Sequence, residues 1–365
     1  MDFRVWDGMN FSGWLRMMSR NRFAVSPSRV AMSLIVGALG PMHASLWALQ
    51  KLLYGRKIEQ TEIREHPIFI LGHWRSGTTY LHELLVTDSR HTFANTYNCF
   101  SPNHFLVSSG TFKRCFSFLL PKLRPMDNMP LGFDRPQEDE FALCNMGIGS
   151  PYLTFAFSNR PPQDQEYLDM EGLSPGELAR WKRAFLWFLK CVTVQDPKRI
   201  VLKSPPHTGR IRVLLELFPD ARFVHITRDP YVLFPSTVNL FRRLYRREGL
   251  QVPRYEGLEE HVFTTLNRMY AALDRDRPLV DDRRFCEVRY EDLVQDPIEQ
   301  MRTIYDQLEL GDFDKTLPVL KPFVESRSAY KKNRYEITPE TRAEIARRWR
   351  GYIERYGYSS EEAEV

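Results

Sequence analysis

Residues 67–79 read Pro67-Ile-Phe-Ile-Leu-Gly-His-Trp-Arg-Ser-Gly-Thr-Thr79, an apolar run that leads into a glycine-spaced loop. Residues 80–85 follow as Tyr-Leu-His-Glu-Leu-Leu. The apolar run predicts a strand over residues 67–71, and the segment after the loop predicts a helix that begins at Thr78. A loop between a strand and a helix can wrap backbone N–H groups around a phosphate at the helix N-terminus. The stretch therefore predicts a phosphate site within an α/β unit.

The loop departs from the version that binds nucleoside triphosphates. Gly72 and Gly77 keep the G-x-x-x-x-G spacing, and Thr79 keeps the final hydroxyl. Thr78 stands where the triphosphate-binding loop has a lysine, and the cation is instead Arg75, inside the loop. The lysine that reaches the outer phosphates of a triphosphate is therefore missing. This predicts a nucleotide that carries a different transferable group.

Composition favours a globular enzyme. The chain has 365 residues, of which 43% are hydrophobic and 27% charged, with a net charge of +5. The mild positive charge is weak evidence for a nucleic-acid partner, and it suits an enzyme that handles anionic cofactors. Five cysteines without a C-x-x-C pair argue against a disulfide framework, and no spacing of His, Cys, Asp and Glu suggests metal ligands. We therefore expect a cytoplasmic protein with reduced thiols, no metal and no nucleic-acid partner.

Strands and helices alternate after the loop. Strand-like runs at 199–203, 221–227 and 284–290 are separated by helical segments, which predicts parallel pairing with crossover helices. The capping box Ser174-Pro-Gly-Glu177 predicts the start of a further helix. Residues 92–160 are rich in aromatic side chains and predict an irregular insert, of the kind in which acceptor pockets are built. The predicted fold class is α/β, a P-loop NTPase-like three-layer sandwich with helices on both faces of a central parallel sheet.

Three segments of the chain are distinguished by composition. We expect a helical N-terminal extension over residues 1–60, a catalytic domain over 61–358 and an acidic tail over 359–365. Residues 30–50 carry no charged side chain, and their length could just span a bilayer. Several Gly, Ala and Ser residues make them only moderately apolar. This favours helices packed on the catalytic domain or on a membrane surface over a transmembrane anchor, with all three arrangements open at this point.

The predicted strands end in cations. One strand closes on Lys203, and another is followed by Arg228-Asp229-Pro230, where Asp229 is expected to start a helix or to pair with an arginine. In open α/β sheets the ligand binds at the carboxyl ends of the strands, so these cations should join Arg75 in one site. An enzyme that hydrolyses ATP or GTP would need a strand-end carboxylate for magnesium. We therefore favour a metal-free anionic donor, with a P-loop kinase or ATPase and a non-catalytic nucleotide-binding module as alternatives.

Three segments resemble motifs of the sulfotransferase superfamily and occur in the expected order. Residues 72–79 are similar to its 5′-phosphosulfate loop, in the R-S-G-T-T form of tyrosylprotein and many bacterial members. Residues 228–236, Arg-Asp-Pro-Tyr-Val-Leu-Phe-Pro-Ser, resemble its 3′-phosphate motif. Residues 288–293, Val-Arg-Tyr-Glu-Asp-Leu, resemble its V-R-Y-E-x-L segment. Each motif alone is common, but together they are specific, and they cover residues 67–293.

The resemblance implies an enzyme that uses 3′-phosphoadenosine 5′-phosphosulfate (PAPS) and releases adenosine 3′,5′-bisphosphate. It implies a role for each matching position. The 5′-phosphosulfate would be bound by Arg75, Ser76, Gly77, Thr78 and Thr79. The 3′-phosphate would be bound by Arg228 and Ser236, with Tyr290 near the adenosine. Lys203 matches a lysine near the bridging oxygen, and Lys331 and Lys332 are placed like the basic loop that closes over the donor.

The acceptor hydroxyl must lose a proton, so a base should face the sulfur from the side opposite the leaving oxygen. The tyrosylprotein enzymes have a catalytic glutamate soon after the phosphate loop, but residues 92–105 contain no carboxylate here. The run 136–143, Pro-Gln-Glu-Asp-Glu-Phe-Ala-Leu, offers replacements. Glu138 is the first candidate for the base, Glu140 the second, and His104 the non-carboxylate option. The two glutamates would point to different sides of a helix, so we do not expect both in one site.

The expected reaction is in-line transfer of the sulfuryl group to an acceptor hydroxyl, with an amine as the lesser option. Fixed N–H donors and cations would stabilise the negative charge that grows on the leaving oxygen. The acceptor classes left open are glycans, lipids, small alcohols or phenols, and tyrosyl peptides.

Overall fold

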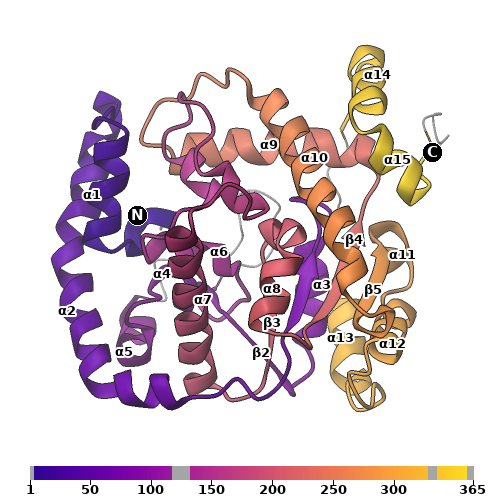
Figure 1. Ribbon diagram of the computed structural model, residues 1–365, viewed down its shortest axis with the longest axis horizontal. Helices are drawn as coiled ribbons and strands as arrows, with labels where there is room; N and C mark the ends of the chain where they lie inside the picture. Colours follow the sequence, from indigo (N-terminus) through magenta and orange to yellow (C-terminus); the bar gives the residue numbers. More distant parts are fainter. Residues whose placement is uncertain (1–3, 117–131, 328–334, 360–365) are drawn as a thin grey trace. The chain divides into compact units, whose positions relative to one another are not determined.

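The phosphate loop follows the central strand of a parallel sheet. The computed structural model describes residues 4–116, 132–327 and 335–359, and within them five strands form one sheet in the order β2-β3-β1-β4-β5 (Figure 1). In that order the strands are His91–Phe93, Arg199–Lys203, Ile68–Leu71, Arg222–Thr227 and Phe285–Arg289. Every residue of β1 is buried, as expected for a parallel strand covered on both faces. The predicted α/β fold of the P-loop type, with helices around a central parallel sheet, is confirmed.

The strand register decides which residues meet at the end of the sheet. β4 pairs in parallel with both β1 and β5, and Thr227 is opposite Arg289. Because these strands run in one direction, their carboxyl ends lie at the same edge. The residues that follow them along the chain, Gly72, Arg228 and Tyr290, therefore emerge together.

The chain forms two compact units. Unit 1 comprises Met1–His66, Thr92–Leu202 and Arg242–Glu256. Unit 2 comprises Pro67–His91, Lys203–Phe241 and Gly257–Val365. The predicted N-terminal extension over residues 1–60 falls inside unit 1, where it shares a core with later segments. The predicted domain boundaries themselves stay a prediction.

Unit 2 carries the helices that follow the central strands. α3 (Thr78–Leu85) begins directly after the phosphate loop, and α11 (Tyr290–Gln295) directly after β5. α9 (Pro230–Glu248) follows β4 and continues into unit 1. The other helices described in unit 2 are α8 (Ile211–Leu217), α10 (Leu258–Asp276), α12 (Pro297–Gln307), α13 (Leu317–Arg327), α14 (Pro339–Arg348) and α15 (Arg350–Tyr356).

The sequence pattern from Thr338 to about Tyr356 predicts one helix, and this prediction is wrong. The helix is interrupted at Trp349, which has φ −109° and ψ 24° and separates α14 from α15. The Trp349 side chain is only 1% exposed and packs edge-on against the rings of Phe234 and Phe263. Burial of this ring therefore determines where the chain turns.

Unit 1 combines the N-terminal helices with the aromatic-rich insert. Its helices are α1 (Phe11–Arg20), α2 (Val30–Gln60), α4 (Thr96–Phe100), α5 (Phe105–Phe116), α6 (Asp139–Asn145) and α7 (Pro175–Gln195). α7 begins at the predicted capping box, with the Ser174 N–H donating to the Glu177 carboxylate at 2.9 Å. The prediction that residues 92–160 are irregular is wrong, because α4, α5 and α6 lie there. These helices are short, and buried aromatic side chains such as Phe105 and Tyr97 hold them, so no long periodic pattern marks them.

The start of the described chain is anchored on Glu248, the last residue of α9. Glu248 Oε2 accepts from the Val5 N–H at 2.9 Å, and the Trp6 indole N–H donates to the Glu248 carbonyl at 2.7 Å. The Glu248 side chain is 3% exposed, and burial raises its pKa to about 7.

The free energy of unfolding should therefore fall with rising pH through Glu248. The unfolded chain releases this proton near the ordinary pKa of 4.5, whereas the folded chain holds it to about 7, so unfolding releases a proton within this window. Relative to Glu248→Gln, whose amide oxygen can still accept from Val5, the native protein should lose up to about 1.4 kcal/mol per pH unit. Urea unfolding at about pH 5 and about pH 7 measures this difference. An unchanged difference between the two proteins would contradict the expectation.

Candidate active site

The phosphate loop has a backbone conformation that requires glycine at two positions. Gly72 and Gly77 have φ of +147° and +106°, a region that residues with a side chain rarely enter. The Gly72 N–H donates to Thr208 Oγ1 at 2.8 Å, and Ser76 Oγ donates to the His73 carbonyl at 2.8 Å. These bonds close the loop on itself and on the chain after β3.

Gly77 lies against the ring of Tyr290. A Cβ on Gly77 would lie 2.3 Å from Cδ2 of that ring, closer than any real contact. Gly77 is also the N-cap of α3 and has no side chain to cap the first turn. Helix N-termini present N–H groups without an intrahelical acceptor, and the helix dipole favours negative charge there. The N–H groups at Thr78 and Thr79 are therefore suited to an anion, as the sequence predicts.

Arg75, Arg228 and Ser236 form one cluster in unit 2. Arg228 Nη1 donates to the Arg75 carbonyl at 2.8 Å, and Arg75 Nε donates to Ser236 Oγ at 2.9 Å. Arg75 itself has φ +72°, a conformation that costs a non-glycine residue about 1–3 kcal/mol. The hydrogen bonds to Arg228 and Ser236 hold this strained residue in place. The predicted 3′-phosphate motif and the predicted phosphosulfate loop are thus in direct contact.

The third motif completes the cluster through Tyr290. The Arg228 guanidinium lies over the Tyr290 ring, 4.1 Å from its centroid. Glu291 accepts from the Asp229 N–H at 3.1 Å, and the Asp229 carboxylate accepts from the Tyr231 N–H at 2.8 Å. Asp229 therefore starts α9, one of the two roles that the sequence predicts for it. The motifs at residues 228–236 and 288–293 meet because Thr227 at the end of β4 is opposite Arg289 at the end of β5.

Of the three lysines predicted to contact the donor, Lys203 is the one that lies within the described residues. Lys203 is the last residue of β3, as predicted, and its side chain is 2% exposed. A buried ammonium needs a nearby anion or hydrogen-bond acceptors, which suits a position beside an anionic donor. Its role near the bridging oxygen stays a prediction. Lys331 and Lys332 lie outside the described residues.

Sequence reasoning missed Tyr352, which comes from α15. Its hydroxyl accepts from the Arg228 N–H at 3.0 Å and donates to the Arg228 carbonyl at 2.9 Å. Burial raises the pKa of Tyr352 well above its ordinary value, so the hydroxyl keeps its proton. Tyr352 therefore positions the backbone of Arg228. No local signal marks it, because 124 residues separate the two positions in sequence.

The two candidate carboxylate bases lie at the start of α6 in unit 1. Glu140 is 0% exposed, and its Oε1 accepts from Ser150 Oγ at 2.5 Å. Glu138 is the N-cap of α6, is half-buried, and accepts a hydrogen bond from the Tyr152 hydroxyl. The two carboxylates thus have different partners. Glu138 is the more accessible of the pair, which keeps it as the first candidate.

His104 is buried, with both ring nitrogens in contact with other polar groups. Its Nδ1 lies 2.8 Å from Ser108 Oγ, and its Nε2 lies 2.8 Å from His43 Nδ1. His43 Nε2 must donate to the Asp7 carbonyl at 2.8 Å, because that oxygen can only accept. His43 Nδ1 then accepts from His104, and burial lowers the pKa of His104 to about 4. These contacts favour a structural role for His104 over the predicted role as a base.

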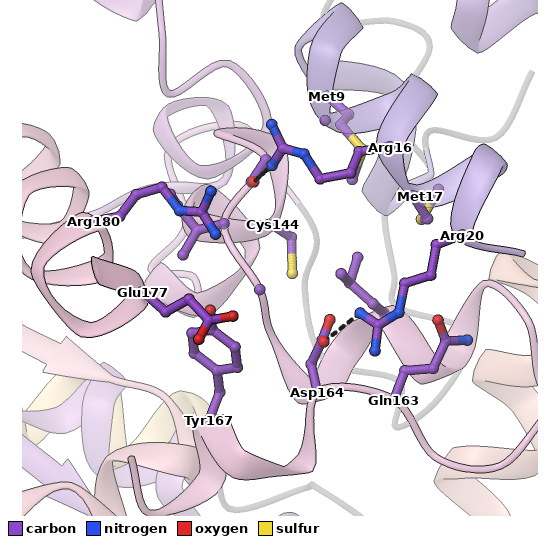
Figure 2. Close-up of a pocket in the computed structure, with 15 residues that line it drawn as sticks. Met9, Arg16, Met17, Arg20, Cys144, Gln163, Asp164, Tyr167, Glu177 and Arg180 are labelled. Carbon is purple, nitrogen blue, oxygen red and sulfur yellow. Dashed lines mark hydrogen bonds and ion pairs between the residues drawn. The ribbon is translucent and has the colours of Figure 1, made fainter. Parts of the chain in front are cut away.

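A cavity of about 160 Å³ lies within unit 1 (Figure 2). α1 contributes Arg16 and Arg20 to its wall, and Arg20 pairs with Asp164. Arg16 donates to the Gly147 carbonyl at 3.0 Å. None of the predicted donor-binding residues lines this cavity. Among the described residues there is also no group of three or more His, Cys, Asp or Glu side chains that could hold a metal ion.

Residues 67–315 match the model of the sulfotransferase family. The chain belongs to that family. It is 49% identical over 354 residues to the omega-hydroxy-beta-dihydromenaquinone-9 sulfotransferase Stf3 of Mycobacterium bovis and of Mycobacterium tuberculosis. The alignment covers 97% of this chain and 91% of each relative.

Two solved structures have the same fold. Sulfotransferase STF9 from Mycobacterium avium has a TM-score of 0.67 at 21% identity, covering 92% of this chain and 87% of that one. Sulfotransferase STF1 from Mycobacterium tuberculosis has a TM-score of 0.60 at 19% identity, covering 93% and 90%. Family membership decides between the enzyme classes that the loop alone left open: this chain is a sulfotransferase, not a kinase or an ATPase.

Gly77→Ala should weaken binding of adenosine 3′,5′-bisphosphate by at least about 10-fold. The new Cβ would strike the Tyr290 ring, and φ of +106° would add about 1–3 kcal/mol of backbone strain. Calorimetric titration of the purified protein measures the affinity. Gly351→Ala is the matched control, because a Cβ there meets nothing within 4 Å. Equal affinity in the two variants would show that the loop does not need Gly77.

Proposed function

We propose that this sulfotransferase transfers the sulfuryl group of PAPS to a hydroxyl group by in-line displacement. The observation that carries the proposal is the cluster of Arg75, Arg228, Ser236 and Tyr290 beside a glycine loop that lacks the triphosphate lysine. Two fixed guanidinium groups and a helix N-terminus suit a donor with two separate anionic groups. A 5′-phosphosulfate and a 3′-phosphate on one nucleoside meet that requirement.

Each part of the cluster has a role in this proposal. The N–H groups from Arg75 to Thr79, with the hydroxyls of Ser76 and the two threonines, would bind the 5′-phosphosulfate. Arg228 and Ser236 would bind the 3′-phosphate. Tyr290, whose ring lies under the Arg228 guanidinium, would contact the adenosine.

The chemistry then requires one bond to form and one to break. The acceptor oxygen attacks sulfur, and the bond between sulfur and the bridging oxygen breaks, so the electron pair leaves with adenosine 3′,5′-bisphosphate. Lys203 and the loop N–H groups would stabilise the charge on that oxygen. Glu138 would take the acceptor proton, and the product would be a sulfate ester.

The proposed acceptor is a hydroxylated lipid of the menaquinone type. The relatives that are 49% identical over almost the whole chain are named for sulfation of omega-hydroxy-beta-dihydromenaquinone-9. The carry-over of that acceptor class to this chain is the proposal. A hydroxylated menaquinone analogue, offered with PAPS and followed by mass spectrometry of the sulfate ester, tests it directly.

Arg228→Ala should weaken binding of adenosine 3′,5′-bisphosphate by about 10- to 100-fold, because a charge-assisted hydrogen bond to an anion is lost. Calorimetry in a buffer with EDTA measures the affinity for the bisphosphate. A separate titration with ATP in the presence of magnesium is the comparison. Arg283→Ala is the matched control, because that side chain is 77% exposed and pairs with Asp281. Selective binding of ATP that needs magnesium would overturn the assignment of the donor.

Glu138→Gln should lower turnover by about 10²- to 10⁴-fold, the usual contribution of a general base. Affinity for adenosine 3′,5′-bisphosphate should stay unchanged, because the donor cluster does not include Glu138. Glu256→Gln, at an exposed position of unit 1, is the control. Normal turnover in Glu138→Gln would mean that another group accepts the proton.

A further inference from the structure

The N-terminal helices carry positive charge almost throughout, and Glu59 near the end of α2 is their one acidic residue. Between residues 8 and 58 the sequence has no Asp or Glu, although the whole chain has 46 acidic and 51 basic residues. This segregation of charge is therefore not a consequence of overall composition. The cations in the segment are Arg16, Arg20, Arg22, Arg29, Lys51, Arg56 and Lys57, of which only Arg29 is half-buried and the others are exposed.

The same helices expose most of the large apolar side chains on the described surface. Of the fourteen that are exposed in the described residues, eleven lie between Phe11 and Leu53. Leu52 is 82% exposed, Leu34 68% and Leu53 62%. Exposed apolar residues are normal when scattered, but a concentration on one pair of helices indicates an interaction site. The others are Phe11, Leu15, Phe23, Val30, Ile35, Met42, Trp47 and Leu49.

α1 and α2 form an antiparallel pair through close contacts at two glycines. A Cβ on Gly40 would lie 2.6 Å from the Phe11 ring, and one on Gly37 would lie 3.4 Å from Trp14 Nε1. Figure 1 shows α1 alongside the first half of α2. We call the eleven exposed apolar side chains and seven cations of α1, α2 and the segment that joins them the α1–α2 face.

The side of α2 that faces away from the α1–α2 face is held to the rest of unit 1 by polar contacts. His43 bonds to His104 and to the Asp7 carbonyl, both at 2.8 Å. Gln50 Oε1 accepts from the Leu106 N–H at 2.9 Å. By length and composition the helical segment Pro27–Gln60 could cross a membrane. Of its apolar 18-residue stretch, 28% is buried inside the protein. A helix held by these contacts cannot cross a bilayer, because the bonded groups would have to enter hydrocarbon.

We propose that the α1–α2 face is a docking surface for an anionic lipid bilayer, with both helices in the plane of the interface. The apolar side chains would enter the boundary of the acyl chains, and the cations would contact lipid phosphates. An anionic bilayer is the partner that matches a face with both exposed apolar groups and an excess of positive charge, although Arg20 is paired with Asp164. The proposal rests on these features alone and does not depend on the donor or the acceptor.

The test is co-sedimentation of the full chain with vesicles. Vesicles of phosphatidylcholine and phosphatidylglycerol should bind the protein, and added salt should weaken binding. Leu52→Glu with Leu53→Glu should lower vesicle affinity at least about 10-fold, since two exposed leucines can no longer enter the interface. Arg56→Gln with Lys57→Gln should lower it about 5-fold per cation. Val319→Glu in α13, where the side chain is 57% exposed, is the matched control and should bind as the native protein does.

Four outcomes of the vesicle experiment would overturn the proposal. They are absent binding, equal loss in the Val319→Glu control, equal binding to pure phosphatidylcholine, and resistance of bound protein to alkaline carbonate, which indicates a spanning helix. Light scattering that shows a dimer dissociated by the Leu52 and Leu53 changes would also overturn it, in favour of a second copy of the chain. Calorimetry with adenosine 3′,5′-bisphosphate on each variant tests donor binding separately from vesicle binding. The affinity of each variant for the bisphosphate should be unchanged when its vesicle binding is lost.

Discussion

The register of β4 on β5 is the constraint on which the donor cluster depends. Because Thr227 is opposite Arg289, the next residues, Arg228 and Tyr290, lie face to face where the strands end. Tyr290 then covers Gly77, and Arg228 bonds to the carbonyl of Arg75. A shift of one residue in this pairing would separate Tyr290 from Arg228 and Gly77, since neighbouring residues of a strand point to opposite faces.

The cations of this sulfotransferase are used in two different ways. Arg75 and Arg228 are fixed by hydrogen bonds and by an aromatic ring, so their positions are set before any anion binds. Such preorganisation is what stabilisation of a developing negative charge requires. The cations between residues 8 and 58 are mostly exposed, and that stretch has no acidic residue, although Arg20 pairs with Asp164. In the proposed docking they would attract an anionic surface without a fixed geometry.

Unit 1 shows how buried polar groups fix the arrangement of helices. His43 on α2 and His104 beside α5 are joined by a hydrogen bond, and burial lowers the pKa of both, so neither carries charge at neutral pH. Glu140 is likewise buried against Ser150. These groups stabilise the packing of the insert, and they leave Glu138 as the candidate base with partial access to solvent.

The sequence by itself determined the phosphate loop, four of the five described strands and the three motifs, because those signals are local: glycine spacing, apolar runs, and an arginine eight residues before a serine. Only the tertiary structure decided which distant groups support them. Tyr352 reaches Arg228 across 124 residues, and the burial of Trp349 divides the last helix. The apolar pattern of α2 could not say which side is covered, since both sides are apolar. Burial depends on which segments pack together, and that is a property of the folded chain.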